Sequence, residues 1–293
     1  MRKFSIFTVI FTFIALILGN LVVATHSGDA CGTDWPFCNG SLIPDFTDYH
    51  VVIEYSHRIF TTLLGLVILI NAIGALVSEH KTKAVRNLAF ASIGLLLFQS
   101  MIGGLNVLLG TPPGFSTFDV LFSQLLLLVM VLLSYSLHEN KVPVEAAHRE
   151  AVKMSYRTFA IGFIVYIAQT ALGAFFKHSR ASNVVLDIPA AEYLIETYQA
   201  ANVVYFLHWV GTVIIFVSAL WFVIYNSKFK YHFSLAWLYF ASILLNAGVG
   251  IAIVVTKNVV FLSSMHMLVS TITMIIGGSI LGGYWFKMQK RHI

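Results

Sequence analysis

Three ionisable side chains standing close together, Glu54, His57 and Arg58, are the residues in this sequence best suited to chemistry. They lie near the start of a long apolar segment, and a helix there places Glu54 and His57 on one face, about one turn apart. Ionisable groups inside a membrane span are costly and usually serve a site. Glu54 is a candidate for proton exchange, and His57 for binding a metal. The alternative is a cluster that only marks the membrane boundary.

Two further histidines, His208 and His266, lie on separate apolar segments at similar depth from one membrane face. Two neutral imidazoles facing each other in a helical bundle are the usual axial pair of a low-spin haem iron. The sequence therefore predicts a haem between them, although either histidine alone would more often be a hydrogen-bonded packing residue. Lys177 and His178 are candidates for contacting the haem propionates, and an interfacial anchor is the alternative.

The elements that must position these residues are membrane helices. Of the 293 residues, 58% are hydrophobic and 11% are charged, which excludes an ordinary soluble domain. Leucine, isoleucine and phenylalanine runs favour helices over the short alternating strands of a membrane barrel. The sequence predicts an all-α polytopic protein with eight spans, each about 20 residues or longer: 4–25, 51–78, 84–109, 116–138, 152–176, 197–226, 231–256 and 258–286. The first segment has a basic start but no clear cleavage motif, so we expect a span there and not a signal peptide.

Lysine and arginine set the expected orientation. With the N-terminus in the cytosol, 14 of the 18 basic residues fall on the cytosolic side: Arg2, Lys3, Lys81, Lys83, Arg86, Lys141, Arg149, Lys153, Arg157, Lys228, Lys230, Lys287, Lys290 and Arg291. The sequence thus predicts a multi-pass protein of the cell membrane with both termini cytosolic. The net charge of +5 follows from this topology, and no nucleic-acid partner is predicted.

Cys31 and Cys38 are the only two cysteines, and they lie in a long outer loop, residues 25–50. On the oxidising side of the membrane we expect them to form a disulfide, because Gly32 and Pro36 supply turns between them. Two free structural thiols are the alternative. A metal pair is disfavoured because no other cysteine is present to complete it.

The second part of the chain repeats the first. The sixth span carries His208 as the second carries His57, and the eighth carries His266 near where the fourth carries Asp119. We therefore expect two pseudo-symmetric four-helix bundles, residues 1–140 and 156–293, joined by a cytosolic linker, residues 141–155. With Asp119 in place of a second histidine, the first bundle leaves one side of an iron open for an exchangeable or reactive porphyrin. A degenerate site fits the same residues.

The loop from Ser27 to Gly40, followed by Glu54-Tyr55-Ser56-His57-Arg58, resembles haem A synthase. The eight-span layout with His208 and His266 extends the resemblance over nearly the whole chain. Members of that family oxidise the C8 methyl group of haem O to the formyl group of haem A for terminal oxidases. The resemblance implies a catalytic Glu54, a substrate-haem ligand in His57, a permanent haem b on His208 and His266, and a disulfide between Cys31 and Cys38.

Four positions depart from the family's pattern. Asp119 stands where the family has a second histidine, with Gln124 a weaker candidate for that role, so Asp119 is itself a candidate metal ligand. Ala24 replaces a basic residue before the cysteine loop, and Trp209 replaces an arginine after His208. The second outer loop lacks the cysteine pair that many bacterial members carry.

The resemblance therefore predicts a membrane oxidoreductase whose haem b relays electrons. Its expected partners are the substrate haem O, membrane lipid, a haem O synthase, terminal oxidase assembly factors and an electron acceptor that the sequence does not name. A non-catalytic haem-binding or haem-delivery protein is the alternative. A quinone-linked dihaem cytochrome b would require a second histidine pair.

Overall fold

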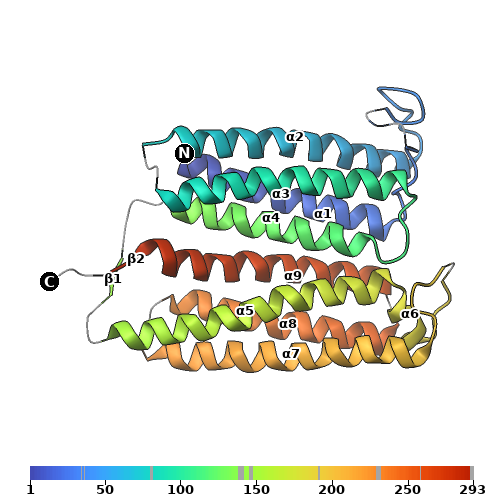
Figure 1. Ribbon diagram of the computed structural model, residues 1–293. Coiled ribbons are helices and arrows are strands. Elements are labelled where there is room, and N and C mark those ends of the chain that lie inside the picture. Colours follow the sequence, from blue (N-terminus) through green and yellow to red (C-terminus); the bar gives the residue numbers. More distant parts are fainter. Residues whose placement is uncertain are drawn as a thin grey trace.

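The computed structural model shows a bundle of long helices running side by side (Figure 1). It describes residues 1–33, 35, 37–79, 82–137, 142–144, 148–190, 192–228, 232–257 and 259–290, the last four of these and 142–144 by their backbone alone. The helices are α1 (Arg2–Ala24), α2 (Tyr49–Val77), α3 (Lys83–Leu108), α4 (Ser116–Ser136), α5 (Arg149–His178), the short α6 (Ala181–Leu186), α7 (Tyr198–Ser227), α8 (Phe233–Thr256) and α9 (Val259–Gly282). A π-helical turn, Gly283–Lys287, extends α9, and strands β1 (Val142–Val144) and β2 (Met288–Lys290) pair in parallel.

Eight of the described helices are long and apolar enough to cross a membrane, which confirms the predicted number of spans, and their ends lie within three residues of the predicted ones. Side chains set several of the starts. Asp48 accepts a hydrogen bond from the His50 N–H (2.8 Å) at the start of α2, and Thr82 accepts one from the Val85 N–H (3.2 Å) at the start of α3. Each cap satisfies a backbone donor that the first turn of a helix leaves unpaired.

The helices gather in two groups (Figure 1). Helices α1 to α4 pack on one another and form what is here called the first half, and α5 to α9 form the second half. The halves meet where α9 packs against α1 and α4, and where α4 packs against α5. Helix α9 is therefore the element of the second half with the widest contact with the first.

The two halves have different interiors. Small and aliphatic side chains such as Ala72, Ala75 and Ala89 fill the core of the first half, whereas Tyr156, Phe163 and other aromatic rings fill the second. Small residues let membrane helices approach closely. Many large apolar side chains elsewhere on the spans are exposed, as expected of a surface that faces lipid tails.

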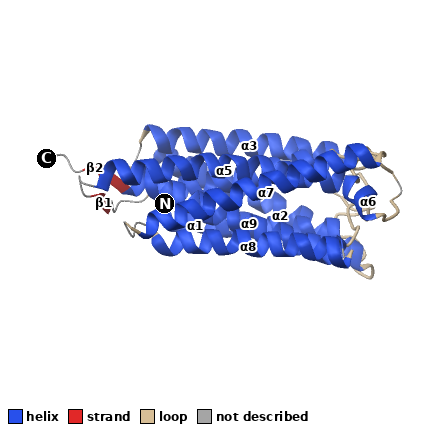
Figure 2. Cartoon of the chain, turned by 90° about the horizontal axis from the view of Figure 1, so that it is seen from below, coloured by secondary structure: helices blue, strands red, loops and turns tan. Residues whose placement is uncertain are grey.

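The N-terminus and β2 lie at one end of the bundle, and α6 lies at the opposite end (Figure 2). The cysteine loop joins the same end as α6 (Figure 1). This arrangement agrees with two termini on one side of a membrane, but their cytosolic placement stays a prediction. The division into residues 1–140, 141–155 and 156–293, and the pseudo-symmetry of the halves, also stay predictions.

Several predicted features fall outside the described residues. They are Asp34 and Pro36 in the cysteine loop, Lys81, Lys141, Lys230 and Arg291 among the basic residues, the side chains of Lys287 and Lys290, the span ends at 138, 231 and 258, and most of the linker before residue 148.

Candidate functional site

His208 on α7 and His266 on α9 face each other inside the second half. Their ring centroids are 6.5 Å apart, and the ring planes are inclined at 59°. Metal–imidazole bonds of about 2 Å from two rings to one shared ion place the centroids roughly 6 Å apart. The separation of the two rings is thus compatible with one shared metal ion, and the predicted axial pair stays a prediction.

The partner of His266 fixes which ring nitrogen is available. Its Nδ1 lies 3.0 Å from the backbone carbonyl oxygen of Asn246 on α8. A carbonyl only accepts hydrogen bonds, so Nδ1 carries the proton and Nε2 keeps its lone pair. Metal-bound histidines commonly have such a partner on the other nitrogen. His266 is thus prepared to bind a metal through Nε2.

Gln169 on α5 orients the other ring. Its amide nitrogen lies 2.9 Å from His208 Nδ1 and donates to the Thr212 hydroxyl (3.0 Å) and to the His208 carbonyl oxygen (2.5 Å). A metal-bound His208 needs an acceptor at Nδ1, so the Gln169 amide would have to turn its oxygen there and give up its hydrogen bond to the His208 carbonyl oxygen. Sequence reasoning missed Gln169, because the face of α5 that meets α7 depends on how the helices are rotated.

Glycines of neighbouring helices lie against both rings. A Cβ at Gly173 on α5 would come within 2.8 Å of His208 Cε1, and a Cβ at Gly250 on α8 would come within 3.4 Å of His266 Cε1. The first distance is too short for a real side chain. The glycine at position 173 therefore lets the His208 ring lie directly against the backbone of α5, and Gly250 lets the His266 ring lie against α8.

His57 in the first half has the same kind of neighbour. A Cβ at Gly19 on α1 would come within 3.2 Å of His57 Nε2. Sequence reasoning missed Gly19 and Gly173, although the recurrence of a Leu-Gly pair in the first helix of each half was an available signal.

Asp119 is hydrogen-bonded to a side-chain amide. It stands at the position that comparison of the two halves matches to His266. Its carboxylate accepts a hydrogen bond of 2.5 Å from the Gln99 amide nitrogen on α3. Gln124, the weaker candidate for the same role, donates to the Thr271 hydroxyl on α9 (2.7 Å). Among the described residues no group of three or more histidine, cysteine, aspartate or glutamate side chains could hold a metal ion. The side chains present fit a group that brings most of its own ligands, such as a porphyrin.

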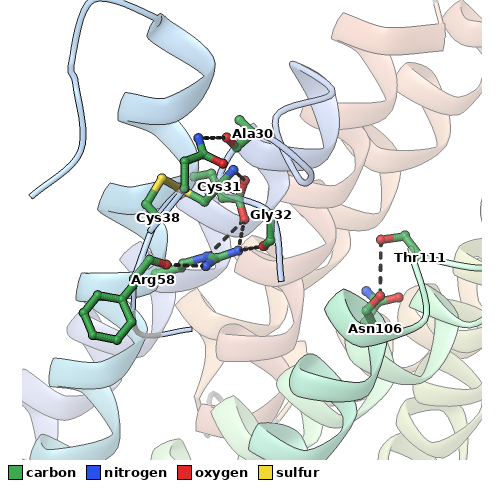
Figure 3. A network of polar contacts seen from close by, with 10 residues as sticks. Ala30, Cys31, Gly32, Cys38, Arg58, Asn106 and Thr111 are labelled. Atoms are coloured by element: carbon green, nitrogen blue, oxygen red, sulfur yellow. Dashed lines mark hydrogen bonds and ion pairs between the residues drawn. A yellow bond between two sulfur atoms is a disulfide. The ribbon is translucent and has the colours of Figure 1, made fainter. Parts of the chain in front are cut away.

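Glu54 and Arg58 form a buried ion pair beneath the cysteine loop (Figure 3). Glu54 is 3% exposed and Arg58 is 9% exposed. Arg58 donates to Glu54 Oε1 from Nη2 (2.5 Å) and from Nε (3.0 Å). Because both charges are buried away from solvent, the ion pair is stable only with these hydrogen bonds and with backbone groups that satisfy the remaining donors and acceptors.

The loop supplies those backbone groups. Arg58 also donates to the carbonyl oxygens of Gly32 (2.6 Å) and Phe37 (3.1 Å), and Glu54 Oε2 accepts from the Cys31 N–H (2.7 Å). The Cys31–Cys38 disulfide is present and fully buried, as predicted (Figure 3). The ion pair therefore fastens the disulfide-closed loop to the outer end of α2, and we call this arrangement the loop clamp.

Lys177 and His178 lie at the outer end of α5, both half-buried. Lys177 is one helical turn beyond Gly173, so it lies on the face of α5 that meets His208. The His178 carbonyl oxygen accepts a hydrogen bond from the Gly114 N–H (2.8 Å), which ties the end of α5 to the turn before α4. The structure thus brings Lys177 near the histidine pair, whereas Glu54 and Arg58 belong to the loop clamp.

Eight apolar helices of this length, packed side by side, define a class: polytopic membrane proteins built as helical bundles. The particular family follows from the whole sequence. Residues 2–276 match the family model of COX15-CtaA, described as cytochrome oxidase assembly protein, and the chain belongs to this family.

Curated relatives support the same assignment. A protein named Heme A synthase from Alkalihalophilus pseudofirmus is 30% identical over 277 residues, which cover 93% of each chain. Its namesake from Halalkalibacterium halodurans is 29% identical over 278 residues, again 93% of each chain. One from Exiguobacterium sibiricum is 32% identical over 208 residues, 68% of this chain and 67% of the relative. The first two similarities extend over both halves, so the resemblance noted in the sequence is confirmed.

Proposed function

We propose that this protein is a haem A synthase, a membrane oxidoreductase that converts the C8 methyl group of haem O into the formyl group of haem A for terminal oxidase biogenesis. Membership of the family and full-length similarity to proteins of that name support the proposal. The observation that carries it is the facing pair of His208 and His266, with ring centroids 6.5 Å apart in the membrane interior.

In this proposal the second half holds a permanent haem b. His208 and His266 bind its iron through Nε2, Gln169 and the Asn246 carbonyl fix the ring orientations, and Lys177 with His178 meets the propionates at the outer end of α5. A haem with two imidazole ligands supplies reversible one-electron transfer. Gly173 and Gly250 let the two imidazole rings pack directly on the neighbouring helices.

The first half holds the substrate haem O. His57 would be its ligand, which requires that its Nε2 move away from Gly19, and a lone imidazole would permit the haem to exchange. A separate proposal is that Asp119 is a second ligand of the substrate iron. Its carboxylate would then have to give up the hydrogen bond from Gln99.

Glu54 is the proposed catalytic carboxylate. Its two oxygens differ, because Arg58 holds Oε1 with two N–H groups while Oε2 accepts from the Cys31 N–H. Proton exchange with the substrate would therefore use Oε2 and would require the cysteine loop to release it. Arg58, which the sequence suggested as a cofactor contact, then acts by holding the carboxylate in place.

The proposed topology has both termini in the cytosol and the cysteine loop outside, supported by the distribution of lysine and arginine and by the position of the N-terminus and β2 at one end of the bundle. The proposed partners are membrane lipid, a haem O synthase, terminal oxidase assembly factors and an electron acceptor of unidentified type.

The test is to purify the protein from aerobic cells that also make haem O and to identify the extracted pigments by mass. Haem A is expected with the parent protein. Glu54→Gln is expected to bind haem normally but to lower the haem A yield by about 10²- to 10⁴-fold, the usual contribution of a general acid or base. An undiminished yield in this variant would remove Glu54 from the mechanism.

A second candidate function is non-catalytic haem binding or delivery. The Gln99–Asp119 hydrogen bond favours it, because it occupies the carboxylate at the position where the first half would need a second ligand. Bound haem b without any haem A in the same pigment extract would support this candidate over the synthase.

A further inference from the structure

A cavity of about 240 Å³ lies between the two halves of the bundle, at the end that carries the N-terminus. One face of α1 forms its first wall, since Arg2, Ile6 and Val9 follow one another there at helical spacing. The other walls are formed by α4 and α9 near their last turns. The cavity is therefore bordered by both halves, at the opposite end of the bundle from the loop clamp.

The cavity opens because α1 and α9 diverge. Toward the opposite end the two helices are in contact, since the Asn20 amide nitrogen donates a hydrogen bond of 3.2 Å to the Ser264 carbonyl oxygen. Figure 1 shows α1 sloping away from α9 toward the N-terminus. Beside the cavity a Cβ at Gly278 would come within 2.8 Å of the Leu128 side chain, so α4 stays close to α9 there. A ligand that fills the cavity thus completes the contact between α1 and α9.

The lining of the cavity is polar at one end and apolar at the other. Arg2, Ser134 and Ser279 lie close to the ends of their helices, which brings them near the membrane surface. Val9 and Ile275 lie deeper along the same helices. A buried water needs only about 10–15 Å³ of such space, so the cavity can hold a much larger molecule. This change in polarity with depth fits an amphipathic ligand whose head group lies at the surface.

The polar end of the cavity carries an unbalanced positive charge. The Arg2 guanidinium has no hydrogen-bond or ion-pair partner among the described residues, and the Ser279 hydroxyl has no hydrogen-bond partner among them either. The described residues that line the cavity include no carboxylate. A guanidinium matches the geometry of a phosphate group with paired N–H donors. The polar end is therefore suited to an anionic group, and a phosphate fits its donors.

We propose that this cavity binds one phospholipid with an anionic head group. Arg2 holds the phosphate, with the Ser279 hydroxyl beside it, and an acyl chain lies along Val9 and Ile275. Basic pockets between membrane helices on the cytosolic side bind such head groups, and the proposed topology puts this end of the bundle in the cytosol. The bound lipid joins α1 to α9 and so strengthens the contact between the halves. The inference requires no bound haem and does not depend on the proposed function.

Lys3 provides a matched control. It is adjacent to Arg2 in the sequence and carries the same charge, but it does not line the cavity. The orientation of the protein in the membrane needs only a basic residue near the end of the span, and either side chain serves that purpose. Lys3→Gln therefore lowers the charge of this surface by as much as Arg2→Gln without touching the proposed site.

The experiment counts the lipids bound to the purified protein by native mass spectrometry, with phosphatidylglycerol or phosphatidylcholine added to the detergent solution. We expect the parent protein to retain one phosphatidylglycerol and to bind phosphatidylcholine much more weakly. Arg2→Gln should weaken retention of phosphatidylglycerol by about tenfold, the usual effect of losing a hydrogen bond to a charged group. Arg2→Lys should keep part of the retention, and Lys3→Gln should leave it unchanged.

A second variant tests the cavity without changing any charge. Ser279→Leu fills part of the space and should also weaken lipid retention. If Ser279→Leu is unstable, Ser279→Ala, which removes only the hydroxyl, decides in its place with a smaller loss.

Equal retention of the two lipids by the parent protein would overturn the inference, as would equal loss in Arg2→Gln and Lys3→Gln, since either result indicates attraction to the surface as a whole. Inorganic phosphate should not raise the unfolding temperature as phosphatidylglycerol does. Equal stabilisation by the two would show a site for a soluble anion and would also overturn the inference. The haem content of the same preparations tests the proposed function and not this site.

Discussion

The two halves place a histidine and a glycine in the same relation, but they complete the site differently. In the second half His208 faces His266, and Gln169 and the Asn246 carbonyl hold the two rings. In the first half His57 meets Gly19, while the other polar side chains are engaged in an Asp119–Gln99 pair and in the loop clamp. Under the proposed function, one scaffold would serve a retained haem where both sides are closed and an exchangeable haem where one side stays open.

Replacement of the histidines should break this comparison most completely. His208→Ala or His266→Ala removes one of two axial ligands, so we expect loss of the haem b absorbance from the purified protein. His57→Ala should keep the haem b absorbance and lose only the bound haem O. An unchanged spectrum in both second-half variants would contradict the ligand assignment.

The paired glycines sharpen the comparison with a smaller change. Gly173→Val should crowd the His208 ring and lower haem b occupancy by roughly tenfold or more, because overpacking a close helix contact costs a few kcal/mol. Gly19→Val should have the same effect on haem O alone. Pigment analysis of each variant measures both haems, and the other glycine variant is the control. Equal loss of both haems in either variant would indicate general misfolding.

Among the described residues the loop clamp has no counterpart in the second half, where exposed Trp209 follows His208. Arg58→Met should leave the Glu54 carboxylate buried without its cation and destabilise the protein by about 3–5 kcal/mol. The haem b absorbance of the folded fraction should remain. Unfolding in mixed detergents measures the cost, and the double variant Glu54→Gln/Arg58→Met should recover part of the stability. Full stability of Arg58→Met alone would show that the carbonyl and amide groups of the loop are enough to stabilise the buried Glu54 carboxylate.

Much of this architecture could be predicted from the sequence. The eight spans follow from apolar runs long enough to cross a bilayer, and the disulfide follows from two cysteines close together in one outer loop. The facing of His208 and His266 followed from their matched depth on two helices that enter from the same side. Each of these depends on features that can be counted along the chain.

Other contacts could not be predicted because they depend on helix rotation and loop path. The spacing of Glu54 and Arg58 predicted that they share a face, but not that the carbonyls of Gly32 and Phe37 would complete the arginine's hydrogen bonds. The same limit applies to Gln169 beside His208 and to Asn20 beside Ser264, where partners far apart in sequence meet only after the helices pack.

The loop clamp also constrains how the protein is made. The charges on α2 find their backbone partners on the segment between α1 and α2, which in the proposed topology lies beyond the bilayer. Until that segment has been translocated and folded back, the outer end of α2 carries a carboxylate and a guanidinium that lipid cannot solvate. Insertion of the first helical hairpin and closure of the cysteine loop should therefore proceed as one cooperative step during biogenesis.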